Sequence, residues 1–144
     1  MTISKAISKI EDLIPQRSPI MMVDEVLEVE GDECTCRLTI RQDNFFLESD
    51  GMIAEPGLIE HIAQSASAFA GVRAVLAGAT TPPVGYIGEV KNFCITRRPH
   101  VGEVLITTIT MGPEVQGVTI ISGVTRINGE TVAETQMKIF VRED

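Results

Sequence analysis

The sequence contains no tryptophan, and aromatic side chains make up only 4% of its 144 residues. Proteins that bind single-stranded nucleic acids stack the bases on aromatic side chains, so this composition does not favour such a surface. Positive charge is also scarce, because 12 lysine and arginine residues stand against 20 aspartate and glutamate residues. The resulting net charge of −8 argues against nucleic acid or an anionic membrane as the main partner.

Long apolar runs are missing as well. No stretch approaches the roughly 18 consecutive apolar residues that indicate a membrane-spanning helix. Residues 1–5 show neither an apolar run nor a small-residue cleavage site, so we expect no secretory signal and a cytoplasmic location. The length fits one domain over residues 1–144 and leaves no room for a separate cofactor-binding domain.

Only three cysteines and two histidines are present, which limits metal and disulfide chemistry. Cys34 and Cys36 are two residues apart, so in a strand both would face the same side. No other cysteine or histidine lies near them at metal-ligand spacing. We therefore expect reduced cysteines that pack as small apolar side chains, and neither a metal nor any other cofactor.

The apolar periodicity predicts the order of the elements. A short helix over residues 4–13, with Ser4 as a candidate N-cap, ends before Pro15. Asn128 and Gly129 predict a type I′ turn in a late hairpin. The six predicted strands cover residues 21–30, 33–41, 84–95, 104–111, 118–127 and 131–141.

A long helix, which we expect to start at Pro56 and Gly57 and to end near residues 77–78, separates the first two strands from the last four. No charged residue occurs between Gln64 and Val72, and small residues fill many positions. A helix that is apolar on most sides is typical of a buried element. Strands segregated around one helix indicate an α+β fold with an antiparallel sheet, and a sheet wrapped around one apolar helix is the hotdog fold.

Four blocks of the sequence, in order, resemble the 3-hydroxyacyl-acyl carrier protein dehydratases. Residues 13–26 resemble their N-terminal signature, a Leu-Pro-His-Arg-x-Pro run that leads to a Val-Asp pair. Phe45 and Phe46 resemble the phenylalanine pair ahead of the active-site loop. Residues 56–64 resemble the start of the glutamate-bearing helix, and residues 85–103 resemble the strand and turn over the acyl tunnel. The sequence is also similar to the dehydratases of aryl polyene pathways, and the resemblance implies the hotdog fold.

The resemblance also implies a catalytic pair, from which this sequence departs. The family dehydrates with a histidine in the loop after the phenylalanine pair and a glutamate on the helix of the partner subunit. Glu60 matches the glutamate, and Gln64 matches the glutamine one turn later, which we expect to orient Glu60. The histidine is not matched, because its place falls at Ser49 and neither His61 nor His100 lies in this loop.

Elimination of water from a 3-hydroxyacyl thioester needs a base for the α-proton and an acid for the departing hydroxyl. Glu60 is the candidate acid or base. His61 is its neighbour in sequence and points about 100° away from it on a helix. It could therefore share a substrate atom with Glu60 only across a two-fold interface. The candidate catalytic residues are Glu60, Gln64 and His61.

Candidate binding residues lie at the helix start and in the loop before it. A backbone N–H near Gly57 can bind the thioester oxygen, on which negative charge develops. We expect Phe46, Ser49 and Asp50 to contact the substrate as well. Four cations are either solvated surface charges or a dock for an acidic carrier protein or the phosphate of its pantetheine arm. They are Arg17, Lys91, Arg97 and Arg98.

Three functions are open at the level of the sequence. The first is a dehydratase-like enzyme for 3-hydroxyacyl thioesters of a carrier protein or coenzyme A, in fatty-acid or polyene-type biosynthesis. The second is a hotdog acyl thioesterase in which Glu60 activates water. The third is a non-catalytic subunit that completes the site of an active homologue in a heterodimer. Otherwise we expect a homodimer or a higher homo-oligomer, because joining two sheets edge to edge removes a pair of exposed edges.

Overall fold

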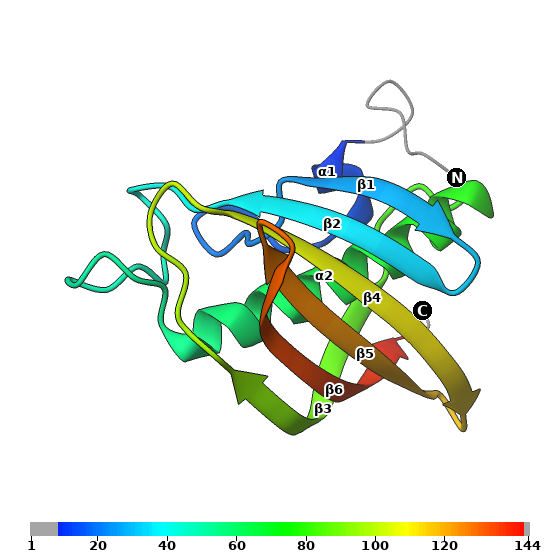
Figure 1. Cartoon of the computed structure of the whole chain (residues 1–144). Coiled ribbons are helices and arrows are strands. Elements are labelled where there is room, and N and C mark those ends of the chain that lie inside the picture. The colour runs from blue at the N-terminus through cyan, green and yellow to red at the C-terminus, as the bar shows by residue number, and fades with distance from the viewer. Residues whose placement is uncertain (1–8, 143–144) are drawn as a thin grey trace.

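The computed structural model describes residues 9–142, with side chains to residue 140. A six-stranded antiparallel sheet curves around the long helix α2, Glu55–Leu76 (Figure 1). The strand order is β1-β2-β4-β5-β6-β3, so β1 and β3 form the edges of the sheet. The strands are β1 (Glu25–Glu30), β2 (Glu33–Thr39), β3 (Val84–Ile95), β4 (Val104–Val115), β5 (Val118–Ile127) and β6 (Glu130–Arg142). The predicted α+β hotdog fold is confirmed.

A single helical turn, α1 (Ile10–Leu13), precedes the sheet. The predicted N-cap Ser4 lies outside the described residues. At the other end of the turn, the guanidinium of Arg17 donates to the carbonyl oxygens of Glu11 and Ile14, at 2.8 and 2.7 Å. These bonds satisfy carbonyl groups that the end of a helix leaves unpaired.

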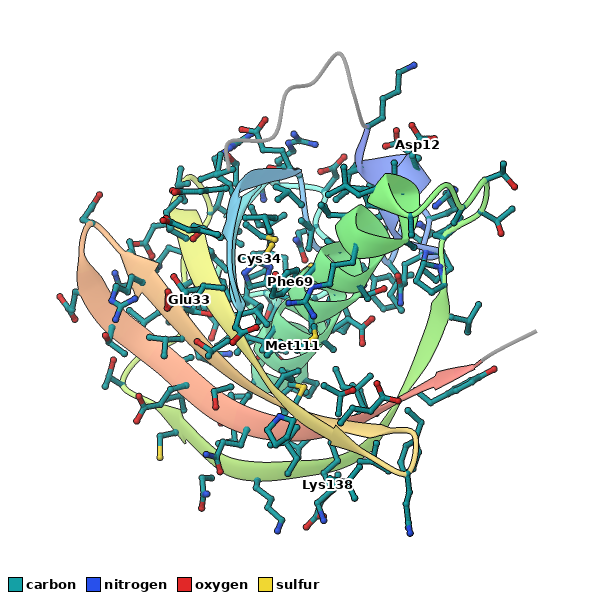
Figure 2. The ribbon with its side chains drawn as sticks, turned by 90° about the vertical axis from the view of Figure 1, so that its right-hand side faces the viewer. Asp12, Glu33, Cys34, Phe69, Met111 and Lys138 are labelled. Carbon is teal, nitrogen blue, oxygen red and sulfur yellow. The ribbon has the colours of Figure 1, made fainter. Side chains whose placement is uncertain are left out.

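Helix α2 is buried along most of its length because its residues are small or apolar. Pro56 lies in its first turn, where a missing backbone N–H costs no helical hydrogen bond. Near its end, the Arg73 guanidinium lies 4.5 Å from the centre of the Phe69 ring. Figure 2 shows Phe69 between the helix and the sheet, near Cys34 of β2. Both side chains belong to the buried core.

Two glycines let α2 approach its neighbours closely. A Cβ atom on Gly71 would lie 2.0 Å from the carbonyl oxygen of Leu13, so α1 packs directly on the backbone of α2. A Cβ atom on Gly123 of β5 would lie 2.4 Å from Cγ2 of Ile62 on α2. These two positions therefore set how near α1 and the sheet come to the helix.

Strand β1 is shorter than predicted. We expected a strand from residue 21, but β1 begins at Glu25. The backbone N–H of Met22 donates to Oε1 of Gln64 on α2, at 2.6 Å, rather than to a neighbouring strand. A side chain of the helix thus replaces the sheet as the partner of this extended segment.

The last three strands are joined by tight turns at residues 116–117 and 128–129, and all four turn residues have positive φ. The values at Asn128 and Gly129 fit the predicted type I′ turn. Strand β4 continues beyond its predicted end at residue 111, because a register shift next to Pro113 lets the pairing resume.

We predict that Gly71→Ala lowers the free energy of unfolding by roughly 3 kcal/mol, because the added methyl meets the backbone of Leu13, which cannot swing aside. Gly88→Ala is the matched control. Its added methyl meets only the exposed ring of Phe140, which can rotate away, so we expect a small effect. Urea unfolding measures both variants, and equal midpoints would contradict the tight packing of α1 on α2.

Candidate active site

A cavity of about 270 Å³ opens between α2 and the sheet. Its helix side consists of residues three or four positions apart, which share one face of α2. They include Glu60, Ala63, Ser67 and Ala70. Its sheet side is mainly apolar and includes Ile87, Met111, Ile121 and Ile139. Glu60 is the one carboxylate among the described lining residues, and an apolar cleft with few polar groups suits an acyl chain.

The carboxylate of Glu60 is held by Gln64, one turn further along the helix. Nε2 of Gln64 donates to Oε1 of Glu60 and to the carbonyl oxygen of Ile20, both at 2.8 Å. Oε1 of Gln64 accepts from the backbone N–H of Met22. Because a backbone N–H only donates and a carbonyl only accepts, these contacts fix which end of the amide faces Glu60. The predicted hydrogen bond between Gln64 and Glu60 is therefore present.

His61 points into the core, where its side chain is 0% exposed. Nδ1 lies 2.6 Å from the carbonyl oxygen of Met22, and Nε2 lies 2.7 Å from Oγ1 of Thr107. Burial lowers the pKa of His61 to about 4, so the ring is neutral at pH 7. Neither ring nitrogen is available to a substrate in the cavity, and this geometry does not support the expected catalytic role of His61.

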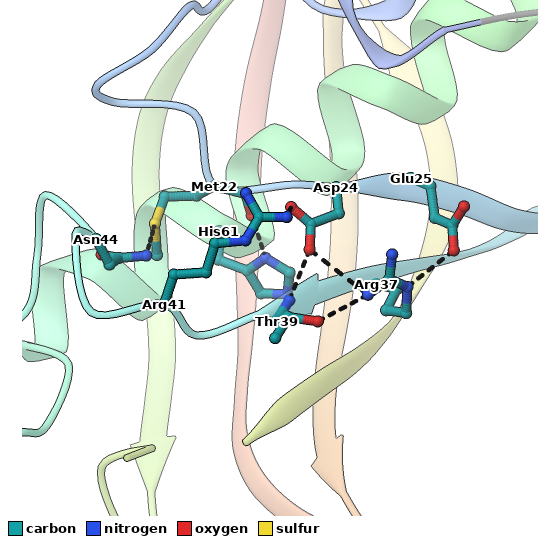
Figure 3. Close-up of polar contacts among 8 residues, drawn as sticks. All are labelled: Met22, Asp24, Glu25, Arg37, Thr39, Arg41, Asn44 and His61. Atoms are coloured by element: carbon teal, nitrogen blue, oxygen red, sulfur yellow. Dashed lines mark hydrogen bonds and ion pairs between the residues drawn. The ribbon is translucent and has the colours of Figure 1, made fainter. Parts of the chain in front are cut away.

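The segment that carries Met22 is tied to β2 through Asp24. Figure 3 shows Asp24 beside Arg37 and Arg41, each with a guanidinium nitrogen 3.6 Å from one of its oxygens. Oδ2 of Asp24 also accepts from the backbone N–H of Thr39, at 2.8 Å. Asp24 is the aspartate of the Val-Asp pair in the family resemblance. Here it anchors the segment and does not line the cavity.

Gly57 and Phe46 are in contact at the start of α2. A Cβ atom on Gly57 would lie 2.6 Å from Cβ of Phe46, so the contact depends on the glycine. The backbone N–H of Gly57 donates to the carbonyl oxygen of Ala54, at 2.9 Å. The N–H that we expected to bind the thioester oxygen is thus already engaged, and neither Gly57 nor Phe46 lines the cavity.

Ser49 and Asp50 lie in the exposed loop between β2 and α2, which projects beyond the sheet (Figure 1). Arg98 forms ion pairs with Glu48 and Asp50 of this loop. A hydrogen bond from the Met52 backbone and the pairing with Arg98 lower the pKa of Asp50. Neither Ser49 nor Asp50 lines the cavity of its own subunit, so a contact with substrate would need the cavity of another subunit.

The expected docking cations each have a partner within the chain. Arg17 binds backbone carbonyl oxygens, and Arg98 pairs with Glu48 and Asp50. Arg97 makes two hydrogen bonds of 2.8 Å to Glu103, and this pairing lowers the pKa of Glu103 to about 2. Nζ of Lys91 lies 3.6 Å from Glu89. Carboxylates thus lie beside Lys91, Arg97 and Arg98, whereas the hydrogen bonds of Arg17 within the described residues go only to backbone carbonyl oxygens.

Three polar side chains near the site were not predicted. Thr107 and Thr125 lie opposite each other on β4 and β5, with hydroxyl oxygens 2.7 Å apart. Gln16 lines the cavity, and its Oε1 is buried without a hydrogen-bond partner among the described residues. Strand alternation marks the threonines as inward-facing, but no sequence signal places them next to a helix histidine.

Within residues 9–142, no group of histidine, cysteine, aspartate or glutamate side chains could hold a metal ion. The sulfur atoms of Cys34 and Cys36 are buried and lie 3.8 Å apart. The hydrogen bond with Cys34, together with burial, raises the pKa of Cys36 well above its usual value. This disfavours the thiolate that reacts or binds metals. The described part of the chain also contains no helix long and apolar enough to cross a membrane.

The sequence matches the family of ApeP dehydratases over residues 8–144. The 3-hydroxyacyl-acyl-carrier-protein dehydratase FabZ of Burkholderia mallei strain SAVP1 is 27% identical over 141 residues, which cover 94% of this chain and 90% of that protein. FabZ of Lactobacillus helveticus strain DPC 4571 is 32% identical over 109 residues, which cover 72% of this chain and 71% of that protein. The chain belongs to the ApeP-like family of hotdog-fold dehydratases.

Solved structures show the same fold. The dehydratase heterocomplex ApeI:P from Xenorhabdus doucetiae superimposes with a TM-score of 0.87 at 16% identity, covering 95% of this chain and 93% of that chain. A hypothetical thioesterase with coenzyme A from Streptococcus pneumoniae TIGR4 superimposes with a TM-score of 0.63 at 12% identity, covering 83% of this chain and 86% of that chain. At such identities the likeness establishes the fold alone.

We predict that the buried, neutral His61 makes the protein less stable in acid. Its pKa is about 4 in the folded protein against an ordinary 6.5, so the unfolded chain takes up the proton first as pH falls. The stability is fully present above about pH 6.5 and falls by about 3 kcal/mol toward pH 4.

Urea unfolding of the wild type and of His61→Asn at pH 7 and pH 4.5 isolates this contribution from that of the carboxylates. The variant should lose less stability between the two pH values than the wild type does. An equal loss in both proteins would contradict the buried, neutral state of the ring.

Proposed function

We propose that this protein is the Glu60-bearing subunit of a dehydratase for 3-hydroxyacyl thioesters of an acyl carrier protein or coenzyme A, in fatty-acid or polyene-type biosynthesis. The observation that carries the proposal is the position of Glu60. Its carboxylate lines an apolar cavity, and Gln64 holds one of its oxygens. The other oxygen has no hydrogen bond among the described residues. Membership of the ApeP-like family supports the same reaction class.

The reaction takes a proton from C2 and a hydroxyl group from C3 of the acyl chain. The C3–O bond breaks, the C2=C3 double bond forms, and the hydroxyl leaves with a proton as water. One group must therefore accept a proton and one must donate a proton. Glu60 can supply one of these steps. No histidine lines the cavity, so we assign the second step to a group from another subunit.

We place that subunit at the β3 edge of the sheet. The 12-residue strand β3 exposes its apolar side chains Ile87 and Val90 to 41% and 36%, whereas Met137, opposite Val90 on β6, is 1% exposed. An open edge with apolar side chains is suited to pairing with the edge of another sheet. Such pairing would also cover the cavity, which Ile87 lines.

We infer that the partner is a homologous hotdog chain that carries the loop histidine absent at Ser49. In the dehydratases that this sequence resembles, the histidine and the glutamate of one site come from different subunits. The similar ApeI:P protein is a dehydratase heterocomplex. A heterodimer would join a partner histidine to Glu60, whereas a homodimer of this chain would contain no loop histidine.

Acyl thioester hydrolysis is the second candidate function. A lone carboxylate in an apolar cavity can activate water, and a hypothetical thioesterase shares the fold. Release of a free thiol from acyl-coenzyme A, measured beside formation of the enoyl product, distinguishes the two reactions. Thiol release without enoyl product would replace the dehydratase proposal with this one.

We predict that Glu60→Gln lowers dehydration of 3-hydroxyoctanoyl-carrier protein at least about 100-fold, because an amide can neither take up nor donate the proton. The variant keeps an oxygen that accepts from Gln64, so its stability should stay within about 1 kcal/mol of the wild type. Mass spectrometry of the acyl group follows the reaction, with the histidine-bearing homologue present.

Glu55→Gln is the matched control for this experiment. It changes an exposed carboxylate in the first turn of the same helix and should leave the rate unchanged. Enoyl product formed at the wild-type rate by the Glu60→Gln variant would rule out the proposed role of Glu60.

We predict that Val90→Lys prevents subunit assembly, because it places a charge among the apolar side chains of the β3 edge. Val115→Lys is the control, since Val115 is also exposed but lies at the end of β4. Light scattering of each protein mixed with the histidine-bearing homologue should show no heterodimer for Val90→Lys and a heterodimer for the wild type and the control. A heterodimer that contains the Val90→Lys variant would contradict the location of the interface.

A further inference from the structure

Two buried threonines of the sheet have no role in the function proposed so far. Thr107 and Thr125 form a directly opposed pair on β4 and β5 and are both 0% exposed. A buried hydroxyl costs free energy unless it is hydrogen-bonded, and an apolar β-branched residue is the ordinary choice at such a position. Their hydroxyl groups bond to each other, and the hydroxyl of Thr107 also bonds to His61. We call these three residues the threonine–histidine network.

The direction of each hydrogen bond in this network is fixed by its end at Met22. The Met22 carbonyl can only accept, so Nδ1 of His61 carries the proton in the 2.6 Å contact. The neutral ring then has a lone pair at Nε2, and the hydroxyl of Thr107 must donate to it. The oxygen of Thr107 is left to accept from the hydroxyl of Thr125.

Both backbone polar groups of Met22 are held by α2. His61 binds the carbonyl, and Gln64, three residues further on the same face of the helix, binds the N–H. Because Oε1 of Gln64 is committed to this N–H, Nε2 is turned to Glu60. Successive hydrogen bonds therefore connect Thr125 to the carboxylate of Glu60 in the cavity. The residues between them are, in order, Thr107, His61, Met22 and Gln64.

We propose that the threonine–histidine network is a positioning device: Thr107 donates to Nε2 and holds the ring of His61 in place, and His61 thereby holds Met22, and through it Gln64 and Glu60, in the geometry for proton transfer. His61 and Thr107 act through Gln64 and never touch the substrate. The catalytic consequence rests on the proposed function of Glu60. The hydrogen bond from Thr107 to His61 does not rest on it.

The hydrogen bond from Thr107 to His61 is tested by ¹⁵N NMR of the protein labelled at histidine. The sequence has only two histidines, so exposed His100 serves as the internal reference. We expect the wild type to show a protonated Nδ1 and an unprotonated, hydrogen-bonded Nε2 for His61. Thr107→Val, which keeps the shape and removes the hydroxyl, should leave Nδ1 protonated because the Met22 carbonyl remains, and should shift the Nε2 resonance because Nε2 loses its donor. Thr107→Ser should restore the wild-type Nε2 resonance.

The catalytic consequence is tested on the complex with the histidine-bearing homologue. Thr107→Val should lower kcat about tenfold while KM stays within twofold, because binding is retained and only the carboxylate is displaced. Thr107→Ser should return kcat to within twofold of the wild type. Thr108→Val is the matched control, because it removes the hydroxyl of the next residue of β4, which lies on the opposite face of the sheet.

An unchanged Nε2 resonance of His61 in Thr107→Val would overturn the proposal, whether or not the wild type is active. A shifted Nε2 resonance with unchanged kcat would overturn the link to Glu60. If Thr107→Val does not fold, Thr107→Ala, which also removes the donor to Nε2, provides the same NMR comparison. Absence of turnover in the wild type would instead count against the function proposed for Glu60.

Discussion

The candidate site depends on how helix α2 holds the backbone of Met22. The segment before β1 leaves the sheet but stays buried, so its N–H and C=O groups need partners that no strand supplies. His61 and Gln64 supply both, at 2.6 Å each. Because the side-chain oxygen of Gln64 accepts from the Met22 N–H, its amide nitrogen is directed to Glu60. The orientation of one carboxylate is thus set by the need to satisfy two buried backbone groups elsewhere.

Among the described residues, the same helix provides the cavity with one carboxylate and no histidine. Alanine and serine on the face of α2 that carries Glu60 are too small to fill the space beneath β3, and an apolar cavity results. Strand β3 has no neighbour on its outer side, so Ile87 and Val90 remain exposed beside this cavity. A carboxylate in a cavity without a histidine, next to an open sheet edge, supports our proposal that a second subunit completes the site. Membership of the ApeP-like dehydratase family agrees with this arrangement.

Much of the fold could be predicted because hydrophobic periodicity indicates helices and strands, and turn residues indicate where they are joined. The charge-free stretch from Gln64 to Val72 indicated the buried helix, and Asn128 with Gly129 indicated the last hairpin. The start of β1 was placed too early, because a helix side chain and not a strand binds Met22. No local pattern reports such a long-range contact.

The site was predictable only in part, for the same reason. Spacing along one helix was enough to pair Glu60 with Gln64. It could not decide where His61 points, because a helix that is apolar all round has no polar side to indicate the cavity. The engagement of the Gly57 N–H by Ala54 and the pairing of Arg98 with the acidic loop also depend on tertiary contacts.

The most direct test of the central claim, that Glu60 supplies one of the two proton transfers at an acyl thioester, is isotope incorporation. Octenoyl-carrier protein is incubated in deuterated water with this chain and its histidine-bearing homologue, and deuterium at C2 of the hydrated product is measured. We predict rapid incorporation with the wild type and background incorporation with Glu60→Gln. Equal incorporation by the two proteins would show that Glu60 takes no part in either proton transfer and would contradict the claim.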